Sequence, residues 1–160
     1  MAYQFPYTTK SGKVSRYYNI DWPVGLSAAN RKDDVMLVQT LFHILYHETE
    51  GFSPPLAVDE IEVTGECDAT TRAYIRYFKR ELLLSGERIY PDEVLDPIRD
   101  NDPDKKSTIS RTRYALTFLV GTTGIHKLDR LQGLPEDEST PVLLRQALKQ
   151  TRKTAQKYGG

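Results

Sequence analysis

Apolar residues recur with a helical period in the first third of the chain. In the stretch 31–49 they lie three or four residues apart on one side: Val35, Val38, Leu41, Phe42, Ile44 and Leu45. This spacing is typical of an α-helix with one wide apolar face. Because such a face is costly to leave in water, we expect the helix to be central and to pack against more than one neighbour.

The residues at the start of this stretch favour a helix N-terminus. Asn30 is a good N-cap residue, and Asp33 and Asp34 fall in the first turn, where the helix dipole favours negative charge. We therefore expect Asn30 to cap the helix.

A second helix is predicted over 69–84. Its apolar face follows steps of four, three and four residues: Thr71, Ile75, Phe78 and Leu82. Asp68 is placed to cap its N-terminus, and a Ser-Gly pair ends it. The connector between the two helices begins at Pro54, alternates apolar and polar residues, and ends at Gly65, as in a short extended segment or loop.

Residues 1–29 show no sustained period of two or 3.6, and prolines and glycines interrupt them. We interpret them as an ordered but irregular lead-in, anchored on the core by Tyr17, Tyr18, Ile20 and Trp22. A tryptophan can bury a large apolar area while its N–H finds an acceptor, so we expect Trp22 to be buried. The alternative is an exposed platform for a ligand.

The stretch 87–106 contains three prolines and a run of acidic residues, which predicts a surface loop. A third helix is expected to begin after Ser107 and to end at Gly121. A strand is the alternative, because apolar residues alternate here at Tyr114, Leu116 and Phe118.

The last helix is predicted from Pro141 to Gly159, with Thr140 as its cap. One of its faces is basic: Arg145, Lys149, Arg152, Lys153 and Lys157. Cations near a helix C-terminus interact favourably with the dipole, so we interpret this side as a solvated face. A patch for an anionic polymer is the alternative.

Composition narrows the function classes. The chain has 160 residues and equal numbers of basic and acidic side chains, 22 of each, which argues against a dedicated nucleic-acid binder. Its length favours a single domain, 1–160, and no apolar run is long enough to span a membrane. Because no leader is visible, we expect the chain to be cytoplasmic as synthesised. Reaching the periplasm or the cell wall would require another route of delivery.

Few residue patterns favour catalysis. His43 and His47 lie four apart, a spacing that lets two imidazoles share one metal, but Ile44 stands where a zinc-protease helix needs Glu. The acidic residues of 100–104 resemble a calcium loop only in composition. Cys67 is alone and has no context that marks a reactive thiol. We therefore predict no catalytic residues, no metal and no cofactor.

Two segments carry a family resemblance. Residues 24–45, VGLSAANRKDDVMLVQTLFHIL, and 63–79, VTGECDATTRAYIRYFK, resemble the paired helical signature of peptidoglycan-binding domains. That signature joins a D-V-x-x-L-Q-x-x-L helix to a D-G-x-[FY]-G-x-x-T loop and a helix ending A-V-x-x-F-Q. The matching positions in this chain are Asp34, Val35, Val38, Gln39, Phe42, Gly65, Thr71, Ile75 and Phe78.

The resemblance implies a mainly α, compact helical bundle with a core at 30–85 and a C-terminal helical extension at 86–160. Interlocking apolar ridges would join the two helices, and Gln39 would hydrogen-bond the loop backbone. Such domains are non-catalytic and bind the wall polymer in a shallow groove near the loop and second helix. Carried over to this chain, that implies a ligand site at Glu66, Asp68, Thr70, Arg72 and Tyr74.

The chain departs from the signature at the loop. Cys67 replaces the loop aromatic, Asp68 the second glycine and Lys79 the final glutamine. Losing an aromatic removes a face on which a sugar ring can stack, and Tyr74 is the candidate replacement.

Three functions follow, in order of preference. The first is a non-catalytic peptidoglycan-binding-like module with a wall-targeting or adaptor role. The second is a protein-interaction adaptor or immunity-like protein that keeps the fold without binding glycan. The third is a small zinc-dependent peptidoglycan hydrolase that uses His43 and His47.

Overall fold

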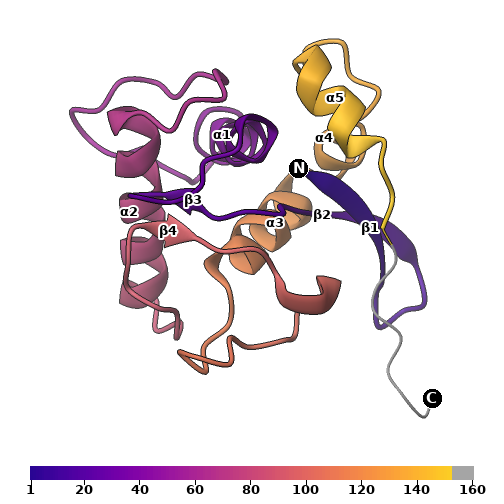
Figure 1. Ribbon diagram of the computed structural model, residues 1–160, viewed down its shortest axis with the longest axis horizontal. Coiled ribbons are helices and arrows are strands. Elements are labelled where there is room, and N and C mark those ends of the chain that lie inside the picture. The colour runs from indigo at the N-terminus through magenta and orange to yellow at the C-terminus, as the bar shows by residue number, and fades with distance from the viewer. Residues whose placement is uncertain (153–160) are drawn as a thin grey trace.

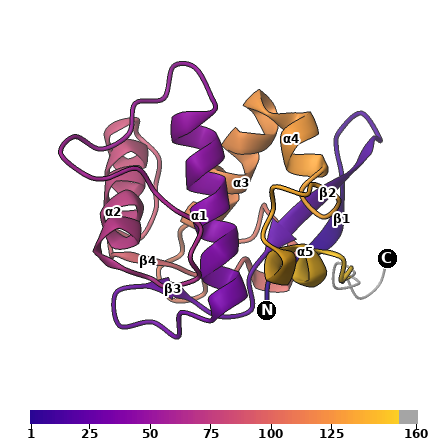
Figure 2. The same ribbon diagram turned by 90° about the horizontal axis from the view of Figure 1, so that it is seen from above.

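One long helix lies at the centre of the molecule. In the computed structural model, which describes residues 1–152, helix α1 spans Lys32–His47 and helix α2 spans Ala69–Leu84. Figure 2 shows α1 with α2 on one side and the C-terminal helices on the other. The predicted helices at 31–49 and 69–84 are confirmed to within two residues, and so is the expectation that the first has several neighbours.

The facing sides of α1 and α2 meet through aromatic rings. The ring centroid of Phe42 lies 5.9 Å from that of Tyr74 and 5.8 Å from that of Phe78. Tyr46 lies 5.7 Å from Tyr74 and 5.6 Å from Tyr77. Tilted and edge-on ring pairs at these separations add to the free energy gained by burying their area. The predicted contact between Phe42 and Phe78 is therefore confirmed, whereas the tyrosines that complete the seam were not part of the prediction.

The start of α1 differs from the prediction. Asn30 has a φ of 49°, and its side chain binds the backbone of Gly25, accepting from N–H at 2.8 Å and donating to C=O at 2.9 Å. Arg31 takes the N-cap position without a side-chain hydrogen bond. The prediction that Asn30 caps α1 was wrong because its amide is committed to the preceding turn. Asp33 and Asp34 do lie in the first turn, as predicted.

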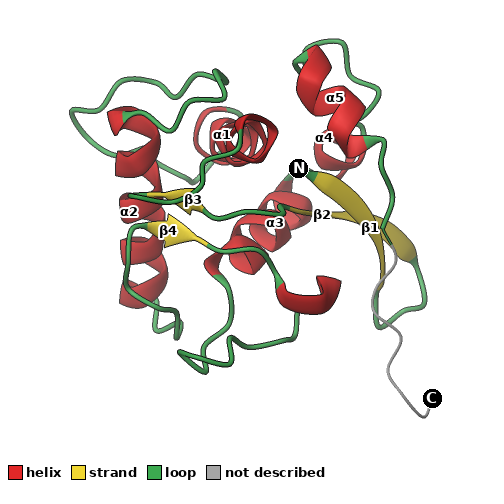
Figure 3. Cartoon of the chain, viewed as in Figure 1, coloured by secondary structure: helices red, strands yellow, loops and turns green. Residues whose placement is uncertain are grey.

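The N-terminal segment is a β-hairpin, so the predicted irregular lead-in was wrong. Strand β1 (Tyr3–Thr8) pairs antiparallel with strand β2 (Val14–Asn19), as Figure 3 shows. Aromatic residues do alternate along β1, at Tyr3, Phe5 and Tyr7, and the Pro6 between them normally argues against a strand. Proline is tolerated here because the strand lies at a sheet edge. The hairpin is held to the core at one end, where Phe5 and Tyr18 are buried.

Trp22 is not buried. Its side chain is 50% exposed, and the Arg31 guanidinium carbon lies 5.4 Å from its ring centroid. The backbone N–H of Trp22 donates to the Asp34 carboxylate at 3.2 Å, which holds this residue at the start of α1 rather than under it. The prediction of burial was wrong for Trp22, and the other anchors are buried or packed on the core: Tyr17, Tyr18 and Ile20.

A second, minimal sheet lies beside α2 (Figure 1). Strand β3 (Val24–Gly25) pairs antiparallel with strand β4 (Val94–Leu95). Gly25 has a φ of 146°, and a Cβ there would lie 2.2 Å from the Glu93 carbonyl oxygen, so only glycine fits. The stretch 87–106 is mostly loop, as predicted, and also contains a 3₁₀ helix at Arg99–Asn101.

The third predicted helix is present, but it begins and ends later in the chain than expected. Helix α3 spans Ala115–His126 and is followed by the short helix α4 (Leu128–Gln132). The alternative of a strand at this position was wrong. Gly121 lies within α3 instead of ending it.

The last helix is much shorter than predicted. Helix α5 spans only Val142–Leu148, its N-cap is Pro141, and the Thr140 hydroxyl caps nothing. The chain then leaves the helix to pair with β1: the Gln4 N–H donates to the carbonyl of residue 150 at 3.0 Å. The prediction failed because these backbone groups bond to the hairpin instead of continuing the helix.

The predicted basic face does not form along one helix. Arg152 lies beyond α5 and pairs with Asp21, while Arg145 donates to the Thr140 carbonyl at 3.1 Å. Lys149 is exposed at the C-cap of α5, and the last two predicted positions, Lys153 and Lys157, lie outside the described residues.

One hydrophobic cluster includes side chains from Ala2 to Leu148. Across residues 1–152, five α-helices are the main secondary structure, with two small two-stranded sheets. None of the helices in this range has the length and apolar character needed to cross a lipid bilayer.

Candidate functional site

The residues predicted to bind a ligand lie around the N-terminus of α2. Glu66 and Asp68 are exposed, and Thr70 and Arg72 are half-buried. The structure brings these four together in the loop and the first turn of the helix. Tyr74 is fully buried, so its ring offers no face to a ligand and does not replace the missing aromatic.

Asp68 has a structural task. Its Oδ1 accepts hydrogen bonds from the backbone N–H and the hydroxyl of Thr71, each at 2.8 Å. It is thus the N-cap of α2, as predicted. Arg72 donates through Nε to the Asp68 carbonyl at 3.4 Å, and Glu66 and Arg72 are the remaining charged side chains at this surface.

A buried glutamine ties the loop to both helices. The Gln39 Oε1 accepts from the N–H groups of Thr64 and Gly65, each at 2.9 Å. Its Nε2 donates to the Glu66 carbonyl and to the Thr71 hydroxyl, each at 2.9 Å. Gln39 therefore holds the backbone of the loop against α1, and its predicted structural role is confirmed.

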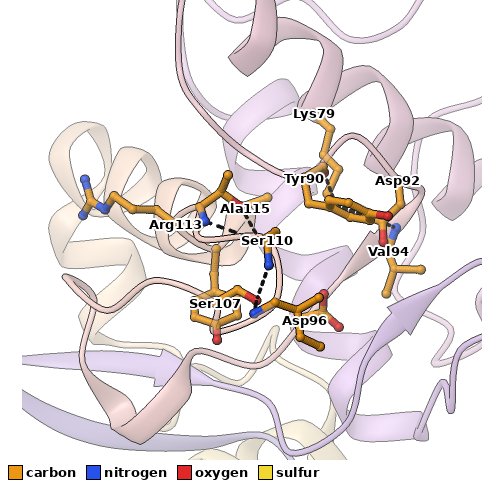
Figure 4. A pocket seen from close by; sticks show the side chains of 12 residues that line it. Lys79, Tyr90, Asp92, Val94, Asp96, Ser107, Ser110, Arg113 and Ala115 are labelled. Atoms are coloured by element: carbon orange, nitrogen blue, oxygen red, sulfur yellow. Dashed lines mark hydrogen bonds and ion pairs between the residues drawn. The ribbon is translucent and has the colours of Figure 1, made fainter.

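A small cavity lies on the side of α2 that carries Lys79 (Figure 4). Lys79 is 5% exposed; its Nζ donates to the Tyr90 carbonyl at 3.2 Å and forms a close ion pair with Asp92. Figure 4 shows the Arg113 guanidinium turned away from the other labelled side chains. The cavity volume of about 190 Å³ is below the range typical of ligand pockets. We therefore interpret this place as a partly buried ion pair that holds the segment before β4 against α2.

A larger groove lies beside α1, and we call it the α1 groove. Four parts of the chain line it: Thr40 and His43 from α1, the connector 60–63, Arg130 from α4, and the segment 139–141. Its volume is about 560 Å³, which is within the range of sites for small ligands.

Charged side chains form a network along the α1 groove. The His43 Nδ1 lies 3.0 Å from a Glu48 oxygen, and its Nε2 lies 3.1 Å from a Glu60 oxygen. Arg130 donates to Glu48 at 3.0 Å and to Asp137 at 2.9 Å. Burial opposes ionisation of Glu48, but the hydrogen bonds from Arg130 and His43 outweigh it and hold the pKa of this carboxyl below its usual range.

Two hydroxyls in the same groove have no hydrogen-bond partner. Thr40 is 4% exposed and Thr140 is 2% exposed, and both Oγ1 atoms are buried and unpaired. A buried hydroxyl without a partner costs about 1–3 kcal/mol. Neither hydroxyl oxygen is accessible to solvent, so both are closed off inside the fold and are not offered to the groove.

The two histidines considered as metal ligands have protein partners. Their ring centroids lie 5.3 Å apart, but both His43 nitrogens contact carboxylates and the His47 Nε2 lies 2.8 Å from the Tyr74 hydroxyl. Within residues 1–152, no group of three or more His, Cys, Asp or Glu side chains has an arrangement suited to a metal ion.

Comparison with protein-family models, with curated proteins and with solved structures finds no match to this chain.

Proposed function

We propose that the chain is a non-catalytic binding module for peptidoglycan. One observation carries this proposal: Gln39, Gly65, Thr71 and the α1–α2 seam form a single packed unit, as expected of the helix–loop–helix signature that the sequence resembles. Gly65 has a φ of 84°, so the tight loop depends on glycine here.

The loop surface has groups suited to a polymer of sugars and short peptides. Glu66 and Arg72 present an acceptor and a set of donors at the N-terminus of α2, on a loop that Gln39 holds rigid. A few such hydrogen bonds give weak binding at one site. Many copies of the same ligand on a wall compensate through effective concentration.

Co-sedimentation with purified sacculi tests the proposal. We expect retention at low salt, and we expect a Glu66→Ala/Arg72→Ala double variant to bind roughly tenfold more weakly because hydrogen bonds to charged groups are lost. The control is Glu87→Ala/Arg88→Ala, which removes the same pair of charges from exposed positions beyond the other end of α2. If the folded wild-type protein is not retained, the proposal is wrong.

A protein-interaction adaptor is the second candidate. The burial of Tyr74 favours it, because the loop then lacks the exposed ring expected for sugar stacking. Under this function a specific protein from the native host should bind the purified chain in a reconstituted complex. The Glu66→Ala/Arg72→Ala variant should weaken that complex while sacculi are not retained.

A further inference from the structure

A pocket between α1 and α2 is lined by aromatic side chains, and we call it the aromatic pocket. It lies next to the C-terminal turns of both helices and takes further walls from the segment 51–53 and from Thr122 of α3. Its volume is about 300 Å³, at the lower end of the range typical of sites for small ligands. Its aromatic residues are Tyr46, Phe52, Tyr77 and Phe78.

Two of these rings meet at a steep angle. The centroids of Tyr46 and Tyr77 lie 5.6 Å apart, and the ring planes are inclined by 61°. The faces of aromatic rings carry partial negative charge, so several rings around one small pocket attract a cation. This attraction is strongest where water is excluded, and the rings of Tyr46 and Phe78 are almost fully buried.

The Tyr46 hydroxyl is an independent sign of a ligand. The residue is only 7% exposed, and within residues 1–152 its hydroxyl makes no hydrogen bond. Unlike the hydroxyl oxygens of Thr40 and Thr140, its oxygen keeps accessible surface. Burial raises the pKa of Tyr46 above its ordinary value of 10.0, and Tyr77 and Glu81, which line the same pocket, add to this shift. The hydroxyl is therefore protonated at neutral pH and has a hydrogen to donate to an occupant.

The charged side chain that lines the aromatic pocket is an acid. Glu81 is exposed, and among the residues that the structure describes its carboxylate has no ion pair or hydrogen-bond partner. The neighbouring hydroxyls of Tyr77 and Ser85 are already used, because they donate to the carbonyls of Ser53 and Leu82 at 2.8 Å. An unpaired carboxylate beside aromatic rings favours a positively charged occupant.

We propose that the aromatic pocket binds a quaternary amino alcohol of the choline type. The trimethylammonium group packs against the rings, Glu81 lies on its open side, and the Tyr46 hydroxyl donates to the ligand oxygen. A primary ammonium would bring three N–H donors that the rings cannot satisfy, whereas a quaternary ammonium has none. This site is separate from the loop at Glu66 and Arg72, so it does not depend on the proposed function.

The test is a titration of the isotope-labelled protein with choline. It is run at about pH 8, above the range in which an ordinary histidine is charged, because His126 packs edge-on against Phe52. NMR should show the largest shifts at Tyr46, Phe52 and Tyr77. Dimethylbutanol, the neutral analogue in which carbon replaces the nitrogen, should bind at least about tenfold more weakly because its attraction to the rings and to Glu81 is lost.

Two conservative variants separate the contributions, and thermal unfolding checks that each is folded. Tyr46→Phe removes only the hydroxyl, so it should weaken choline binding by about three- to tenfold and leave the binding of tetramethylammonium, which has no oxygen, unchanged. Glu81→Gln should weaken the binding of both cations by about two- to fivefold and leave that of dimethylbutanol unchanged. Glu87→Gln, at an exposed position beyond α2, is the matched control and should change none of them.

Equal affinity for choline and dimethylbutanol would overturn the proposal. So would the absence of choline binding to the folded wild-type protein, or shifts confined to another surface. A trimethyllysine peptide that binds more tightly than choline would overturn the assignment to an amino alcohol, because the lysine side chain has no oxygen for the Tyr46 hydroxyl.

Discussion

At the scale of single residues, His47 couples the fold to pH. Its Nε2 lies 2.8 Å from the Tyr74 hydroxyl at the end of the α1–α2 seam. Burial lowers the pKa of His47 below its ordinary value of 6.5; Glu60 acts against this shift and His43 adds to it. The folded protein therefore binds a proton at His47 less tightly than the unfolded chain does.

We expect the free energy of unfolding to fall as the pH drops through 6.5, because the unfolded state then takes up more protons at this site. His47→Gln, which keeps an acceptor for the Tyr74 hydroxyl, should reduce that dependence. Urea unfolding over a pH series measures it, with His126→Gln at an exposed position as the control. If the free energy of unfolding depends on pH as steeply in His47→Gln as in the wild type, this account is wrong.

Local sequence predicts residues whose partners are local and fails where the partners are distant. The role of Gln39 could be predicted because the loop that it binds follows a recognisable helix signature. Tyr74 could not be placed, since its burial depends on Phe42 and Tyr46 of α1, which cover it. The Thr140 hydroxyl was expected to cap a helix, but Pro141 takes that place.

At the scale of elements, the absence of a side chain at Gly25 allows β3 and β4 to lie close together. We expect Gly25→Ala to destabilise the protein by roughly 2 kcal/mol or more, from a strained φ together with a clash against the Glu93 carbonyl. Gly12→Ala is the matched control, because Gly12 also has a positive φ, 83°, but no atom lies within 4 Å of its missing Cβ. Thermal unfolding compares the two, and an equal loss in both variants would show that the close approach contributes nothing.

Helices with a local capping residue and a regular apolar period were predicted well. The Asp68 cap and the apolar period of 69–84 gave α2 its observed bounds. The hairpin and α5 were missed for a different reason. The hairpin depends on cross-strand pairing around Pro6, and α5 stops where the chain bonds to Gln4, almost 150 residues away in sequence. Helical period alone contains no information about either pairing.

At the scale of the whole molecule, one candidate site could be predicted from the sequence and the other could not. The loop surface lies within one signature, so Glu66, Asp68, Thr70 and Arg72 could be predicted as neighbours. Four separate parts of the chain line the α1 groove, and of its residues only His43 was considered in the sequence as a possible ligand-binding group. Thr40, Arg130 and Thr140 line one groove only because α1, α4 and the segment 139–141 come together in the fold, and their spacing in the sequence gives no sign of it.

At the scale of the whole molecule, Arg152 is one of the residues that connect the C-terminal part of the chain to its N-terminal part, and it does so through three contacts. Its guanidinium forms a bidentate pair with Asp21, its backbone N–H donates to the Gln4 carbonyl at 2.8 Å, and its guanidinium carbon lies 3.8 Å from the Tyr3 ring centroid.

Because the ion pair between Arg152 and Asp21 is partly exposed, we expect a coupling free energy of only about 0.5–1 kcal/mol in a double-mutant cycle of Asp21→Asn and Arg152→Ala. Arg152→Ala alone should cost more than Asp21→Asn, since it also removes the contact with Tyr3. Chemical denaturation of the four proteins measures the coupling, with exposed Lys149→Ala as the reference. A coupling near zero would mean that the ion pair adds nothing to the other contacts between the C-terminal part of the chain and the hairpin, among them the backbone pairing with Gln4 and the hydrogen bond from the Gln4 Nε2 to the Leu148 carbonyl.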